Sequence, residues 1–239
     1  SHRKETAQIK SEDALSTAES SSIQGVIIES SSNISKASKK IKKVFANSIL
    51  GLATQDLSIL KKNKKEVKNL ADEIEDLRND LFYFIKNLDE STIKGASNFY
   101  INVLGSLQDI SESLQYISKV TFKHINNNHK ALTFNQIREL KEISLQLETL
   151  FERTKFAFSK NNFKEISSII DSKQDLLGSV REKIDNQISR TKSEESSPKN
   201  TTLYFSILTE SKDLIKATMA MLELYNDQYD SSVKPPKIE

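Results

Sequence analysis

The stretch IEDLRNDLFYFI, residues 74–85, places an apolar side chain at every third or fourth position, which is the spacing of one face of a helix. The same pattern returns 103 positions later in LGSVREKIDNQI, residues 177–188. The apolar positions pair as Ile74 with Leu177, Leu77 with Val180, Leu81 with Ile184 and Ile85 with Ile188. The pattern therefore predicts that one amphipathic helix occurs in both halves of the chain.

The segment that follows each of these helices is also repeated, with an offset of 104 positions. Tyr100, Val103, Leu104, Asp109, Ile110 and Ile117 correspond to Tyr204, Ile207, Leu208, Asp213, Leu214 and Met221. A repeat of about 100 residues predicts a tandem architecture in which amphipathic helices bury their apolar faces together.

Composition supports an all-α fold, because only 5 of the 239 residues are glycine and 3 are proline. We predict two tandem three-helix bundles with six long helices. The expected organisation is a polar lead-in at residues 1–22, a first bundle at 23–125, a second at 126–229 and a tail at 230–239. The helices of the first bundle are expected at about 23–54, 56–88 and 92–123.

Cap signals indicate where the helices of the second bundle begin. Thr133 with Gln136, and Asn162 with Glu165, resemble capping boxes that would open the fourth and fifth helices. Pro198 suits the first position of the sixth helix. The segment from His124 to His129 interrupts the apolar periodicity and is predicted to connect the bundles.

Charge and composition exclude several classes of function. The chain has 35 basic and 33 acidic residues, so the net charge of +2 implies neither nucleic acid nor an anionic membrane as a partner. Without cysteine it has no disulfide and no thiolate ligand. No run approaches the ~20 apolar residues of a spanning helix, so we expect the piece itself to be soluble.

Two sets of residues are candidates for a metal site, and both have a simpler interpretation. His124 and His129 could contribute two imidazoles, but no carboxylate or cysteine lies in that segment, which favours ordinary loop histidines. Carboxylates also recur four residues apart, a spacing that ion pairing with nearby lysines explains without a metal. These sets are Asp72, Asp76 and Asp80, Glu148 and Glu152, and Asp171 and Asp175.

The sequence contains no glycine-rich phosphate loop, no Ser/His/Asp arrangement and no His-Glu-x-x-His motif. We therefore expect no enzymatic activity, no catalytic residue and no cofactor. The absence of a glycine-rich anion cradle and of an arginine cluster also predicts that phosphate is not bound strongly.

Two strings, NFYINVL at residues 98–104 and NTTLYFSILTESKDL at 200–214, resemble the PhoU-like C-terminal cytoplasmic domain of bacterial sodium/phosphate cotransporter proteins. The resemblance covers roughly residues 23–229. It implies a membrane transport domain, made of inverted repeats, in the same polypeptide and at the cytoplasmic face of the bacterial inner membrane. That transport domain would be the partner of this segment, and a homodimer is left open.

Members of the PhoU class carry a Glu-x-x-x-Asp motif in each bundle that gathers metal ions. Aligned by its apolar positions, the motif places Gln108 and Glu112 at the ligand positions of the third helix. It places Lys212 and Lys216 at those of the sixth, where an ammonium would repel a cation. Using Asp109 and Asp213 as the motif aspartates instead places Gly105 and Thr209 at the glutamate positions. We therefore predict no metal site.

Two functions are compatible with these features. The resemblance implies a regulatory domain that modulates sodium-dependent phosphate uptake through protein contacts along its helices. The alternative is a free-standing helical-bundle scaffold or signalling adaptor, in which the duplication extends a binding surface.

Overall fold

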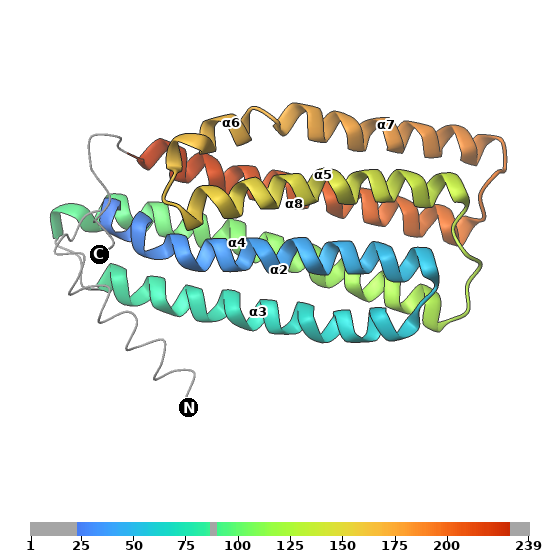
Figure 1. Cartoon of the computed structure of the whole chain (residues 1–239), viewed down its shortest axis with the longest axis horizontal. Helices are drawn as coiled ribbons and strands as arrows, with labels where there is room; N and C mark the ends of the chain where they lie inside the picture. The colour runs from blue at the N-terminus through green and yellow to red at the C-terminus, as the bar shows by residue number, and fades with distance from the viewer. Residues whose placement is uncertain (1–22, 87–89, 230–239) are drawn as a thin grey trace.

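The computed structural model describes residues 23–86 and 90–229, and every regular element in these ranges is helical (Figure 1). Six long helices follow one another: α2 (Ile23–Thr54), α3 (Leu57–Lys86), α4 (Glu90–Asn126), α5 (Phe134–Ser159), α7 (Lys173–Lys192) and α8 (Pro198–Gln228). The short elements η1 (Phe163–Glu165) and α6 (Ile166–Ile170) lie between α5 and α7. The predicted all-α class with six long helices is confirmed. The predicted lead-in at 1–22 and tail at 230–239 lie outside the described residues.

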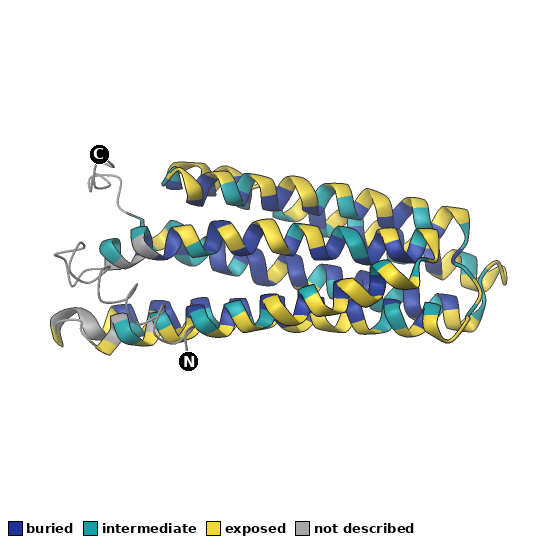
Figure 2. Cartoon of the chain, turned by 60° about the horizontal axis from the view of Figure 1, so that its bottom comes forward, coloured by how far each residue is buried: buried dark blue, intermediate teal, exposed yellow. Residues whose placement is uncertain are grey.

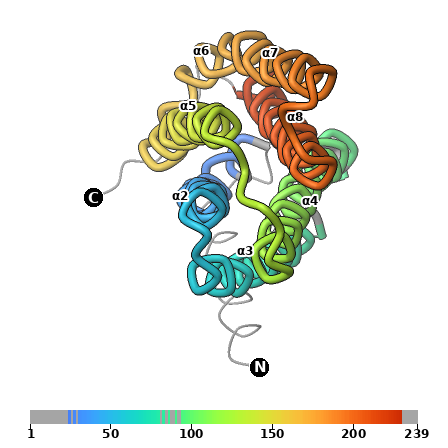
Figure 3. Tube along the Cα trace, turned by 90° about the vertical axis from the view of Figure 1, so that its right-hand side faces the viewer, coloured from blue at the N-terminus to red at the C-terminus, as the bar shows by residue number. Residues whose placement is uncertain are grey.

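The helices pack as one continuous bundle. Within the first half, α2, α3 and α4 all contact one another. In the second half, α7 and α8 pack together, and α5 makes smaller contacts with both. The two halves join along their length, because α2 packs against α5 and α4 packs against α8 (Figure 3). A single hydrophobic core therefore runs through both halves.

Burial follows the repeat. Tyr100 and Tyr204, Ile110 and Leu214, and Leu77 and Val180 are all buried. Buried and exposed residues alternate along each helix, as expected of helices that turn one face to the bundle (Figure 2). Corresponding positions of the two halves therefore contribute to the same core.

The apolar stripe predicted for residues 177–188 is only partly correct. The buried residues of α7 are Leu176, Val180, Lys183 and Gln187, whereas Ile188 is exposed. The face of α7 that meets the bundle becomes polar towards its C-terminus, since Lys183 and Gln187 enter hydrogen bonds with side chains of other helices or of α7 itself. The burial of Leu81 and Ile85 lies outside what the structure describes.

The helix starts at Thr133 and Pro198 are confirmed, and the one at Asn162 is wrong. Thr133 and Gln136 form both hydrogen bonds of a capping box, and Ser197 caps α8 with Pro198 in its first turn. Asn162 makes no side-chain cap. The chain instead forms η1 and α6 and turns again before α7, which lets Phe163 and Ile166 reach the core.

Within the described ranges, none of the helices combines the length and the apolar character needed to cross a membrane.

Candidate functional site

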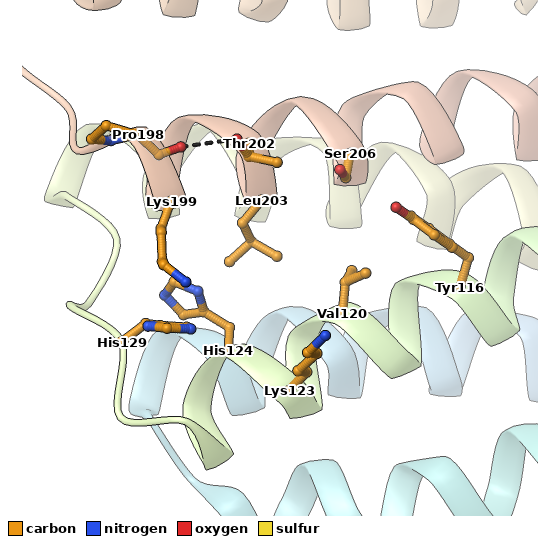
Figure 4. A pocket seen from close by; sticks show the side chains of 10 residues that line it. All are labelled: Tyr116, Val120, Lys123, His124, His129, Pro198, Lys199, Thr202, Leu203 and Ser206. Carbon is orange, nitrogen blue, oxygen red and sulfur yellow. Dashed lines mark hydrogen bonds between the residues drawn. The ribbon is translucent and has the colours of Figure 1, made fainter.

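A solvent-open pocket lies where the C-terminal end of α4, the following loop and the first turns of α8 come together (Figure 4). Its volume is about 330 Å³. It is lined by Tyr116, Val120, Lys123, His124, His129, Pro198, Lys199, Thr202, Leu203 and Ser206. These residues come from α4 and its following loop on one side and from α8 on the other, so the pocket forms only when α4 and α8 pack together.

The two histidines singled out in the sequence both line this pocket. His124 belongs to the last turn of α4 rather than to the predicted connection, and it is buried because the loop folds back over it. Its Nε2 lies 2.9 Å from the carbonyl oxygen of Lys130, and its ring centroid is 5.2 Å from that of His129. Only two ligand-type side chains therefore meet here, and no carboxylate lines the pocket.

Positive charge dominates the pocket. Lys123 of α4 and Lys199 of α8 add two ammonium groups to the two imidazoles, and neither lysine forms an ion pair within the described part of the chain. Partial burial lowers the pKa of His129, and the charges of Lys199, His124 and Lys123 lower it further. Desolvation is the larger cause of this pKa shift, and the neighbouring positive charges add to it, since both disfavour the protonated ring.

A second groove follows the contact between α4 and α8 and contains Glu112 and Lys216, two of the four positions aligned with the metal motif. It has a volume of about 640 Å³ and is lined by the small or polar side chains Ser106, Asp109, Glu112, Ser113, Tyr116, Glu210, Asp213, Lys216, Ala217 and Ala220. Burial raises the pKa of Glu210, and the nearby Asp213 raises it further, while a hydrogen bond from Ser113 acts in the opposite direction.

The residues of this groove do not fit a metal cluster. On α4, Gln108 places an amide at one of the two aligned ligand positions. It donates a hydrogen bond of 3.0 Å to Glu112, which occupies the other. The ammonium of Lys216 lines the groove beside its carboxylates. Across residues 23–86 and 90–229, no three side chains of His, Cys, Asp or Glu are grouped in a way that could hold a metal ion.

We therefore expect purified protein to hold no multinuclear iron or zinc cluster, because Lys216 would repel the cations. Elemental analysis after dialysis against a chelator tests this expectation. Several tightly bound transition-metal ions per chain would contradict it, and substitution of Lys216 by glutamate is the matched change that would favour binding.

The carboxylates at four-residue spacing are in part ion-paired. Glu152 of α5 pairs with Lys42 of α2, and this pairing lowers the pKa of Glu152. On α3, Arg78 lies 3.6 Å from Glu75, within a single helix face. Glu75 belongs to none of the predicted carboxylate runs, so the ion pair of Glu152 is the contact that agrees with the interpretation of these runs as ion-paired helix surfaces.

The most highly connected polar group was not predicted. Glu139 of α5 is buried and accepts two hydrogen bonds from Arg190 of α7, at 2.6 and 3.0 Å. It also accepts hydrogen bonds from the hydroxyl of Tyr204 and, at 3.3 Å, from Asn186. This buried polar cluster, Glu139, Asn186, Arg190 and Tyr204, joins three helices where α5 and α7 otherwise touch little.

Electrostatics keep the cluster in one protonation state. Burial alone would raise the pKa of Glu139, but the hydrogen bonds from Arg190 and Tyr204 outweigh it, and the net pKa is lowered. Burial, with the adjacent Glu139 carboxylate, raises the pKa of Tyr204 well above its ordinary value. The tyrosine therefore remains a donor and the glutamate an acceptor, which is the arrangement of a structural link.

A sequence signal for the buried polar cluster did exist. Glu139 lies three residues after Gln136 and four before Ile143, so it falls on the buried stripe of α5. A charged residue in such a stripe requires a buried partner.

Comparison with protein-family models, with curated proteins and with solved structures gives no match to this chain.

Proposed function

We propose that this chain is a PhoU-like regulatory module of a sodium-dependent phosphate transporter, which modulates uptake through protein contacts. The observation that supports this most is the repeat, whose equivalent helices α4 and α8 lie side by side in the one continuous bundle. Duplication of this kind is the architecture that the resemblance of residues 98–104 and 200–214 implies.

Action by contact suits the described surface better than catalysis does. The groove between α4 and α8 is open and carries both signs of charge, with Glu112 and Asp213 beside Lys216. The residues with the strongest burial and hydrogen bonding, Glu139 and Arg190, are committed to one another inside the bundle. A charged, open helical surface can recognise complementary loops of a partner.

The proposed mechanism is a shift of population. If the bundle binds one conformation of the transport domain more tightly, it favours that conformation by the difference in binding free energy. Coupling free energies between two sites are typically about 1–3 kcal/mol, which corresponds to changes in affinity of about 5-fold to 150-fold.

Uptake of phosphate into vesicles tests this function. Deleting residues 23–229 from the full-length transporter is expected to change the rate of uptake or its dependence on phosphate concentration. Sodium-driven transport should persist, because its pathway would lie in the membrane repeats. Adding the purified segment back to the cytoplasmic side is the matched control, since an effect carried by contact should return.

Identical uptake curves with and without the segment would overturn the regulatory proposal. The alternative, a scaffold that serves other partners, would then account for the same duplicated bundle.

A further inference from the structure

We propose that the pocket between the end of α4 and the start of α8 binds a small phosphate-bearing anion, with its phosphoryl group among Lys123, His129 and Lys199. This site adjoins the groove between α4 and α8 that the proposed function uses, but the two share only Tyr116 among their lining residues. The inference does not depend on the transporter assignment, because it follows from the side chains that surround one cavity.

The first argument is charge. Four basic side chains from three separate segments line the pocket, and no acidic side chain does. Figure 4 shows Lys199 reaching from α8 towards the rings of His124 and His129. Bringing these groups together costs free energy through repulsion, which adds to desolvation, the larger cause, in lowering the pKa of His129. An anion in the pocket would relieve that repulsion.

The second argument is that the charge of the pocket matches the charge of a phosphate monoester. Lys123 and Lys199 supply two positive charges at neutral pH. A phosphate monoester carries about −1.5 to −2 charges at pH 7 and presents three acceptor oxygens. A phosphoryl group therefore satisfies several donors at once, whereas a single carboxylate offers one charge and two oxygens.

The third argument is the shape of the remaining wall. Beyond the basic end, the pocket continues along Val120, Leu203 and the ring of Tyr116, with the hydroxyls of Thr202 and Ser206 on the α8 side (Figure 4). Its volume of about 330 Å³ lies at the lower end of the range for small-molecule sites. Such a wall suits the organic part of a phosphate monoester.

The histidine pair is better explained by an anion than by a metal ion. One ring nitrogen of His124 is engaged with the carbonyl oxygen of Lys130. Lys123 and Lys199 would also repel a cation that approached both imidazoles. Protonated imidazoles and ammonium groups, by contrast, all act as donors to phosphate oxygens.

Calorimetric titration with adenosine 5′-monophosphate, inorganic phosphate and adenosine tests the proposal and separates its ligand sources. Binding of the monophosphate but not of adenosine is expected if the phosphoryl group provides the recognition. Comparable binding of inorganic phosphate would identify free phosphate as the source, and weaker binding would identify an organic monoester. Either result supports a phosphoryl site.

The double variant Lys123→Gln/Lys199→Gln should weaken this binding by about tenfold or more, because it removes both ammonium donors to the phosphoryl oxygens. Lys119→Gln is the matched control, since Lys119 is exposed on the same helix and lies outside the pocket lining. It removes one charge of the same kind and should leave the affinity unchanged.

A second measurement follows the imidazoles by NMR. Saturation with the monophosphate should raise the pKa of His129, because an anion offsets Lys199, His124 and Lys123, the charges that face it. The proposal is overturned if adenosine binds as well as the monophosphate, if neither phosphate compound binds at millimolar concentration, or if Lys119→Gln weakens binding as much as the double variant.

Discussion

Glu139→Ala is expected to lower the free energy of unfolding by about 3–5 kcal/mol, which is the usual effect of removing one partner of a buried ion pair. The substitution leaves the guanidinium of Arg190 without its two carboxylate bonds and also removes the acceptor of Tyr204. Urea unfolding followed by circular dichroism measures the change.

Glu148→Ala is the matched control, because Glu148 is exposed on the same helix. It should change the free energy of unfolding by less than about 0.5 kcal/mol. A double variant, Glu139→Leu/Arg190→Met, should be more stable than Glu139→Ala, since it leaves no buried charge unpaired. Equal stability of Glu139→Ala and Glu148→Ala would contradict the structural role of the cluster.

The buried polar cluster also makes the free energy of unfolding depend on pH, in a direction that the pKa of Glu139 determines. The pKa of Glu139 is lower in the folded protein than its ordinary value. Its contribution is therefore present above the unfolded pKa of about 4.3 and is lost as pH falls through the lower, folded pKa. The difference in stability between the unsubstituted protein and Glu139→Ala should accordingly shrink in that acidic range.

Leu107→Ala is expected to lower the free energy of unfolding by about 2–5 kcal/mol, through lost burial and the cavity that remains. Leu107 is 1% exposed and belongs to the continuous core on α4. Thermal or urea unfolding measures the effect.

Ile101→Ala provides the control for Leu107→Ala. Ile101 lies on the same helix and is 65% exposed, so its truncation should change stability by no more than about 0.5 kcal/mol. If both variants unfold at the same urea concentration as the unsubstituted protein, the assignment of Leu107 to the core is wrong.

Much of the fold was predictable because its signals are local. The capping box at Thr133, the proline at position 198 and the paired positions such as Tyr100 and Tyr204 each depend on residues within one helix or its repeat. The repeat also placed Ile110 on an apolar face, and Ile110 is buried. Local periodicity therefore indicated the class and the number of long helices.

The candidate sites depend on contacts between distant segments, which periodicity does not report. Lys199 is unremarkable beside Pro198 until α8 packs against α4 and brings it to His124. We expected no strong phosphate binding because no single segment contains a glycine-rich loop or an arginine cluster. The basic pocket instead combines side chains from three separate segments, which the sequence of one segment does not reveal. Glu139 was missed because its partner Arg190 lies 51 positions away.

The two ends of the described fold also meet. Ser30 of α2 and the hydroxyl of Tyr225 of α8 lie 2.8 Å apart, and Gln24 donates to the carbonyl oxygen of Gln228. The first and the last described helices therefore meet near their ends, although α2 and α8 touch little along their lengths. A circularly permuted chain that linked residue 229 to residue 23 and opened at the loop 127–133 would have the same core available to it.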